Sequence, residues 1–364
     1  GRLTKVGAGT LALGGANTYT GGTTISQGTL AATGTGAGGS ASNSVNALGA
    51  TGSNVVVESN GTLTLTNVVS NWTGANYVYT GAGTINLVSS GGSAYTQLDG
   101  DLSGFTGTIN VSGNGYNTFQ GATDASAATV NVTTTGAYGL FFQAGANLQL
   151  GALTGNGRIS GGAASGDATL TVGGLNTDTT FSGVIDGSHN TKIALTKVGT
   201  GTLTLSGANT YTGATTISGG KIVMGNFRAL GGSGNSSLIT VAPGAALDMH
   251  GYSATGGTGF FNTLTIGGSG VGGAGALLNS AGGGGYAWNG NWAQNYNISL
   301  TADTLFNFEA PFGQIGSGYS ETSLALNGYT LTKTGAGSYY LVNTTVGDRD
   351  IKVTGGSLIL SKGG

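Results

Sequence analysis

One long segment occurs twice in this chain, and its duplication limits the folds that the chain can adopt. Residues 3–26 read LTKVGAGTLALGGANTYTGGTTIS, and residues 195–218 repeat them with few substitutions, 192 positions later. A third, decayed copy begins with LTKTGAGS at Leu331 and ends with GGSL at 355–358. Self-similarity of this kind is the signature of a repeat architecture, in which stacked units share one core.

The repeated segments are built from short runs in which polar and apolar residues alternate. Examples are TLAL at 10–13, TLTL at 62–65 and at 202–205, and TVNV at 129–132. Alternation with period two indicates β-strands, and each run ends at Gly, Asn or Ser. Glycine accounts for 76 of the 364 residues, and each one inside a helix would cost about 1 kcal/mol. The pattern therefore predicts an all-β chain with almost no helix.

A coiled chain of parallel strands accommodates these short runs best. No run is long enough to form the helix that connects parallel strands in a βαβ unit. In a parallel solenoid each strand lies on its counterpart one turn below, about 4.8 Å away, with about 20 to 25 residues per turn. The alternative is an array of antiparallel β-sandwiches, which would favour regular tight hairpins between paired strands. The sequence shows no such regular bracketing, so we expect a parallel β-helix, or β-solenoid.

The repeated segment resembles a known family of secreted repeats. The run Leu-Thr-Lys-Val-Gly-Xaa-Gly-Thr-Leu-Xaa-Leu, followed by Gly-Ala-Asn-Thr-Tyr-Thr-Gly and Thr-Thr-Ile-Ser, is similar to the passenger-associated transport repeat, also called the autotransporter-associated β-strand repeat. The copies at 3–30 and 195–222 carry this resemblance, whereas the third has Tyr339 and Tyr340 in place of alternating small and aliphatic residues. The resemblance implies a right-handed parallel β-helix, exported to the cell surface or the extracellular medium, where it acts as an adhesin, stalk or fibre segment.

The copies divide the chain into modules of one continuous solenoid. We expect a first module over 1–194, a second over 195–330, and the start of a third, divergent repeat over 331–364. Neither end of the sequence contains a recognisable cap for an open turn, which would expose unpaired backbone groups. This pattern predicts a segment of a longer chain or a subunit that stacks end to end.

Alternation also predicts which side chains face the core. The equivalent positions in the two clear copies are expected to point inward and to stack on adjacent turns. They are Leu11, Leu13, Ile25, Leu203, Leu205 and Ile217. Lys5, Lys197 and Lys333 recur at one motif position, and we interpret them as solvent-facing lysines that discourage lateral strand pairing.

Residues that could perform chemistry are dispersed. The 13 Asp and Glu residues form two close pairs, Asp99 with Asp101 and Asp348 with Asp350, which we interpret as solvated turns. The two histidines, His189 and His250, have no partner at a motif spacing. With no cysteine and no calcium-binding nonapeptide, the sequence predicts no catalytic residues, no metal site and no cofactor.

An aromatic cluster is the most distinctive local feature. Its members are Tyr286, Trp288, Trp292 and Tyr296. Exposed aromatic side chains can stack on sugar rings or contact a protein, so the cluster is a candidate contact surface for a glycan or a host-surface ligand. The structural alternative is that these side chains fill a wide part of the core or cover a loop.

The charge balance and hydropathy restrict the partners. The net charge is −2, and the 11 Lys and Arg residues are scattered, which argues against nucleic acid as a partner. No apolar stretch is long enough to span a membrane. We therefore expect a non-enzymatic structural solenoid that self-associates or continues into a longer chain. The alternative is a carbohydrate-binding or polysaccharide-cleaving β-helix, which would need acidic groups about 5 to 9 Å apart on one face.

Overall fold

The chain folds almost entirely into β-strands. The computed structural model describes residues 1–15, 17–33, 47–67, 77–91, 94–120, 123–162, 165–187, 190–231, 238–251, 262–281, 296–309, 312–315, 322–342, 344–347 and 349–361. Within these residues, helical structure is limited to one short 3-10 turn, Val271–Gly273. None of the described segments forms a helix of the length and apolar character that crossing a membrane requires.

The chain divides into two compact units. The module boundaries that the sequence suggested, at residues 194 and 330, remain a prediction. The first unit contains Gly1–Leu175 and Ser182–Lys192, and the second contains Asn176–Phe181 and Ile193–Gly364. Paired strands within each unit run parallel, and their register shows that each strand lies on a strand from the preceding turn. This arrangement is a parallel β-solenoid, as the short alternating runs predicted.

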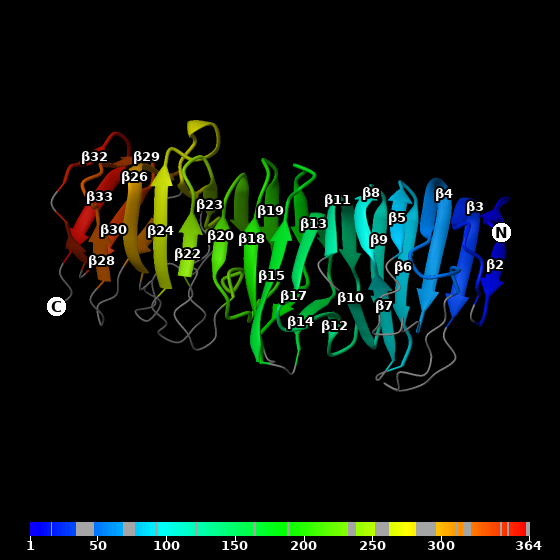
Figure 1. Cartoon of the computed structure of the whole chain (residues 1–364). Coiled ribbons are helices and arrows are strands. Elements are labelled where there is room, and N and C mark those ends of the chain that lie inside the picture. Colours follow the sequence, from blue (N-terminus) through cyan, green and yellow to red (C-terminus); the bar gives the residue numbers. More distant parts are fainter. Residues whose placement is uncertain are drawn as a thin grey trace. The chain divides into compact units, whose positions relative to one another are not determined.

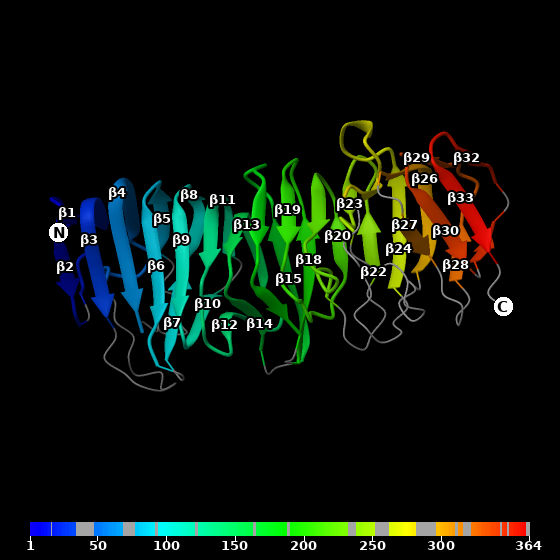
Figure 2. The ribbon, with the colours of Figure 1, turned by 180° about the vertical axis from the view of Figure 1, so that it is seen from behind.

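In the first unit, the strands stack on three faces (Figures 1 and 2). The first face includes β1 (Leu3–Lys5), the beginnings of β3 (Thr23–Thr33) and β4 (Asn54–Thr66), β5 (Val78–Gly81) and β8 (Asp101–Phe105). The second face includes β2 (Thr10–Leu13), the ends of β3 and β4, β6 (Thr84–Ser89), β9 (Thr108–Gly113), and the ends of β11 (Thr123–Val132) and β13 (Asn147–Gly155). The third face consists of β7 (Tyr95–Asp99), β10 (Tyr116–Gln120), β12 (Gly139–Phe142), β14 (Arg158–Gly161) and β17 (Val184–Asp186). The beginnings of β11 and β13 continue the first face, and β15 (Gly166–Val172) pairs with the beginning of β13 there.

Turns of the solenoid vary in length more than the sequence suggested. Thr10 pairs with Thr29, 19 residues later, whereas Thr29 pairs with Thr62, 33 residues later. The short turn lies within the repeated segment, and the long one contains an insertion between β3 and β4. The estimate of about 20 to 25 residues per turn holds for many turns, and the strands on either side of a longer connection still pair in parallel.

Part of the core of the first unit is a column of aliphatic side chains from the second face. Its members follow one another in register, and all except the half-buried Leu11 are fully buried: Leu11, Leu30, Leu63, Ile85, Ile109, Val130 and Leu153. Each buried aliphatic side chain contributes about 1.5 to 3 kcal/mol relative to exposure. Because alternate residues of a strand point to opposite sides, the preceding residues form an outward row of threonines: Thr10, Thr29, Thr62, Thr84, Thr108 and Thr129.

The second unit repeats this plan. One stack contains β18 (Thr191–Lys197), β20 (Thr215–Ile217), β22 (Leu238–Val241), β24 (Asn262–Gly268), the start of β26 (Tyr296–Phe308), β28 (Thr322–Ala325) and β31 (Thr344–Val346). A second contains β16 (Thr179–Phe181), β19 (Thr202–Leu205), β21 (Lys221–Met224), β23 (Ala246–Asp248), β25 (Leu277–Asn279), the end of β26, β29 (Leu331–Thr334) and β32 (Ile351–Val353). A third contains β27 (Phe312–Ile315), β30 (Ser338–Val342) and β33 (Ser357–Ser361).

Candidate functional site

Each of the three repeat lysines lies in the interior of its unit. Lys5 is 7% exposed, Lys197 is 1% exposed and Lys333 is fully buried. Every Nζ donates hydrogen bonds to three backbone carbonyls, at sequence offsets of one, two and 22 residues. The acceptors are Val6, Gly7 and Gln27 for Lys5 (2.9, 2.6 and 3.0 Å), Val198, Gly199 and Gly219 for Lys197 (2.6, 3.3 and 3.4 Å), and Thr334, Gly335 and Gly355 for Lys333 (2.8, 2.8 and 2.9 Å).

The interpretation of these lysines as solvent-facing is therefore wrong. Ile193, Leu195 and Lys197 alternate along β18, so Lys197 shares the inward face with two fully buried aliphatic residues. The period-two pattern that identified the core leucines could have placed the lysine there as well. An ammonium carries three donors and no acceptor, and three carbonyls satisfy it completely. These hydrogen bonds offset part of the cost of burying the charge.

Two glycines complete each lysine site. In the second copy, Gly199 follows Lys197 with φ +69°, and Gly220 lies one turn later with φ +61°. A Cβ on Gly220 would overlap the carbonyl oxygen of Gly201 and lie 2.8 Å from Lys197 Nζ. Both the left-handed backbone and the crowding require glycine at this position.

A second buried contact closes the other end of the repeat. Asn209 Nδ2 donates to the carbonyl of Ala229 at 2.6 Å, and the hydroxyls of Tyr211 and Thr215 are 2.7 Å apart. In the first copy, Asn17 bonds Ala47, and Tyr19 pairs with Thr23 in the same way. The Ala-Asn-Thr-Tyr motif thus fixes the chain segment that follows the repeat.

An asparagine ladder runs along the second face of the first unit. Asn110 donates to Asn86 at 3.0 Å, Asn131 donates to Asn110 at 3.2 Å, and Asn86 donates to Thr64 at 3.2 Å. Thr154 continues the ladder by donating to Asn131 at 3.4 Å. These side chains come from consecutive turns, so the ladder ties one turn to the next.

Stacked tyrosines mark the third face of the same unit. The rings of Tyr95 and Tyr116 are 4.3 Å apart at 7°, and those of Tyr116 and Tyr138 are 4.1 Å apart at 23°. Phe141 meets Tyr138 and Tyr116 edge-on. Burial raises the pKa of Tyr95, and the neighbouring Tyr138 adds to this effect. Because the faces of Tyr116 are covered by the rings on either side, the stack is a structural ladder and not an open platform for sugar rings.

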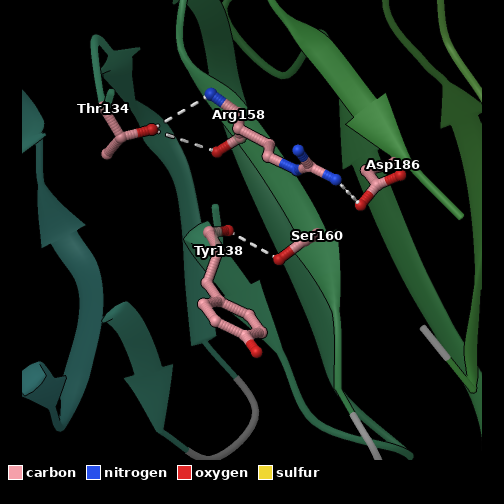
Figure 3. A network of polar contacts seen from close by, with 5 residues as sticks. All are labelled: Thr134, Tyr138, Arg158, Ser160 and Asp186. Atoms are coloured by element: carbon pink, nitrogen blue, oxygen red, sulfur yellow. Dashed lines mark hydrogen bonds and ion pairs between the residues drawn. The ribbon is translucent and has the colours of Figure 1, made fainter. Parts of the chain in front are cut away.

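A polar network continues along this third face (Figure 3). Arg158 on β14 forms an ion pair with the buried Asp186 on β17. Thr134 Oγ1 accepts from the backbone N–H of Arg158 at 3.0 Å, and Ser160 Oγ donates to the carbonyl of Tyr138 at 2.6 Å. The network joins side chains and backbone of three successive turns.

One cluster brings together the residue types of a hydrolase triad, which sequence spacing did not reveal. Ser280 Oγ donates to Asp248 Oδ2 at 2.5 Å and lies 3.1 Å from His250 Nδ1. In a catalytic triad the imidazole lies between the serine and the carboxylate, whereas here the serine lies between the other two. Asp248 Oδ1 also accepts from the backbone N–H of His250 at 2.9 Å, where φ is +46°. The hydrogen bonds of the cluster stabilise the left-handed turn at His250.

Several predicted site residues lie outside the described part of the chain. Tyr286, Trp288, Trp292, His189 and Asp348 are among them, and only the backbone of Tyr296 and of Asp99 is described. Asp101 is exposed, and hydrogen bonds from Ser103 lower its pKa. Among the described residues, no group of three or more His, Cys, Asp or Glu side chains could hold a metal ion.

The proposed core residues occupy two kinds of position. Leu203, Leu205, Ile25 and Ile217 are fully buried. Leu11 and Leu13 on β2 are half-buried. Leu11 pairs with Leu30 on the following turn.

Comparison with known proteins identifies the repeated segment and one similar protein. The family profile of the passenger-associated transport repeat matches residues 3–32 and 195–224. The adhesin BmaC autotransporter of Brucella suis is 32% identical over 355 residues, which cover 90% of this chain and 10% of that protein. The chain thus spans about a tenth of the length of this curated relative. No solved structure matches the chain. Residues 3–32 and 195–224 of this chain are therefore two copies of the passenger-associated transport repeat of autotransporters.

Proposed function

We propose that this chain is a non-enzymatic stretch of an adhesin passenger, displayed at the cell surface or released from it, where it supplies length and stiffness. The observation that carries this proposal is that the polar side chains brought together by the fold bond backbone groups or one another. The lysine sites, the asparagine ladder and the Asp248 cluster all tie segments of chain together. The similarity to an adhesin autotransporter supports the location and the adhesive context.

A replacement experiment separates a spacer from a ligand-binding stretch. In the complete passenger, residues 1–364 are exchanged for an unrelated parallel β-solenoid of equal length, and a second variant lacks them without replacement. A spacer predicts that the exchange preserves adhesion of the bacterium to host cells and that the deletion reduces it. Loss of adhesion in both variants, with surface display unchanged, would instead place a ligand site in this stretch.

The carbohydrate-binding alternative has its own test. Tyr286, Trp288, Trp292 and Tyr296 are replaced together by alanine, and the unaltered chain and this variant are applied to a glycan array. The proposal predicts that the two proteins give the same array pattern and that neither releases products from pectin or alginate. Binding that disappears in the variant would support the alternative, and product release would end the non-enzymatic proposal.

A further inference from the structure

The lysine site recurs where the family profile does not reach. The profile matches 3–32 and 195–224, and the third copy lacks the Ala-Asn-Thr-Tyr motif. Lys333 nevertheless bonds the carbonyls of Thr334, Gly335 and Gly355, at the same three offsets as Lys197. We propose that residues 331–358 form a third transport repeat, and that its defining element is a buried ammonium held by three backbone carbonyls of two successive turns.

The backbone around Lys333 repeats that around Lys197 in detail. Gly335 has φ +80° and Gly356 has φ +61°, in the positions of Gly199 and Gly220. A Cβ on Gly356 would overlap the carbonyl oxygen of Gly337, as a Cβ on Gly220 would overlap that of Gly201. The ammonium, both left-handed glycines and the close approach of the two turns are therefore preserved together.

Position on the solenoid does not account for this recurrence. Lys197 lies on β18 and pairs with Ile217, whereas Lys333 lies on β29, in the stack that contains β19 and β21. In that stack Lys333 follows Phe306, an aromatic core residue. The third copy thus lies on a different face from the second. The lysine site forms on both faces, so it depends on the local sequence and not on the face.

The site couples two turns because its acceptors come from both. Two carbonyls belong to the corner that directly follows the lysine, and the third belongs to the equivalent corner 22 residues later. The ammonium is fully bonded only after the next turn has been laid on the first. Methionine at this position would fill similar space but leave three buried carbonyls without a donor.

Lysine labelling of the unaltered protein tests the site directly. Reductive methylation under native conditions, read by mass spectrometry, is expected to modify the exposed Lys192 and Lys352 at least tenfold faster than Lys197 and Lys333. If Lys333 is labelled as fast as Lys352, the proposal is wrong.

Matched variants test the coupling. K333M and K197M are expected to raise amide exchange of the later corner, at 354–357 and 218–221 respectively, by tenfold or more. Two controls replace exposed lysines: K192M lies on the same strand as Lys197, and K352M lies on the strand that pairs with that of Lys333. Both controls are expected to leave the amide exchange of these corners unchanged. K333M that exchanges like K352M would overturn the proposal, and labelling of the unaltered protein decides the case if K333M does not fold.

Discussion

At the scale of single residues, Lys197 shows how a charge can be part of a solenoid core. Burial of an ammonium is unfavourable, and here three carbonyl acceptors offset part of the lost hydration. Burial lowers the pKa of Lys197 to about 8, while the nearby carboxylate of Asp178 acts in the opposite direction. Lys221 also lies near that carboxylate. The charged state of Lys197 is therefore sensitive to mildly alkaline pH.

This shift gives a signed prediction for stability. Because the folded pKa lies below the ordinary value of 10.5, the unfolded chain binds more protons than the folded chain between pH 8 and 10.5. The free energy of unfolding of the wild type, minus that of K197M, should therefore rise with pH across this window and stay constant below it. Urea unfolding at a series of pH values measures the difference. A difference that falls with pH would mean that the carbonyl bonds stabilise the ammonium more than burial destabilises it.

Leu203 is the sharpest test of strand register at this scale. It is fully buried and pairs with Ile222 on the next turn. We predict that Leu203→Asp lowers the free energy of unfolding by about 3 kcal/mol or more, because it buries an unpaired carboxylate. Thr204→Asp, at the adjacent outward position, should cost less than about 1 kcal/mol. Equal losses in denaturant unfolding would show that the two side chains are not on opposite faces.

At the scale of elements, the strands bury apolar side chains, whereas the corners require particular residues because of their backbone conformation and close contacts. Gly220 and Gly244 both have positive φ, at +61° and +87°. A Cβ on Gly220 meets the neighbouring corner, whereas a Cβ on Gly244 meets nothing within 4 Å. The two positions therefore separate backbone strain from crowding.

We predict unequal costs for alanine at these corners. Gly244→Ala should destabilise by about 1 to 2 kcal/mol, the cost of a left-handed conformation. Gly220→Ala should cost about 1 to 3 kcal/mol more, because the added methyl forces the two corners apart. Thermal and denaturant unfolding of both variants measures the difference. Identical losses would mean that the close approach at Gly220 can relax.

The sequence was sufficient to predict the strands, but it was not sufficient to predict the side-chain contacts between turns. Alternation in TLTL at 202–205 predicted a strand with Leu203 inward, because that signal is local. The bonds from Asn209 to Ala229 and from Ser280 to Asp248 join residues 20 and 32 positions apart, and turn lengths vary, so spacing alone does not predict them. Lys197 was misplaced for a different reason: its charge was given more weight than its position in the alternation.

At the scale of the whole molecule, the low charge is the dominant property. The chain has 24 charged residues among 364 and a net charge of −2, so electrostatic repulsion between copies is weak. We predict that the chain self-associates in a concentration-dependent and nearly salt-independent way, as measured by sedimentation velocity.

Thr84→Lys with Thr108→Lys distinguishes lateral from end-to-end contacts. These substitutions place charges on the outward threonine row, so they should abolish lateral association and leave end-to-end association intact. If the unaltered chain gave a single sedimenting species at every concentration, the prediction of self-association would be wrong.

The outward threonine row has a consequence for how such a chain can change in length. Thr62, Thr84 and Thr108 follow one another in register, and Gly83 and Gly107 precede the last two. Removal of residues 84–107 would therefore join Gly83 to Thr108 and recreate the original junction, with Thr108 taking the register of Thr84. The shortened protein is expected to fold, with β-sheet circular dichroism and cooperative unfolding retained, whereas removal of residues 84–95 would break the register. Loss or duplication of one whole turn at this junction is therefore expected to leave the register of the neighbouring turns unchanged.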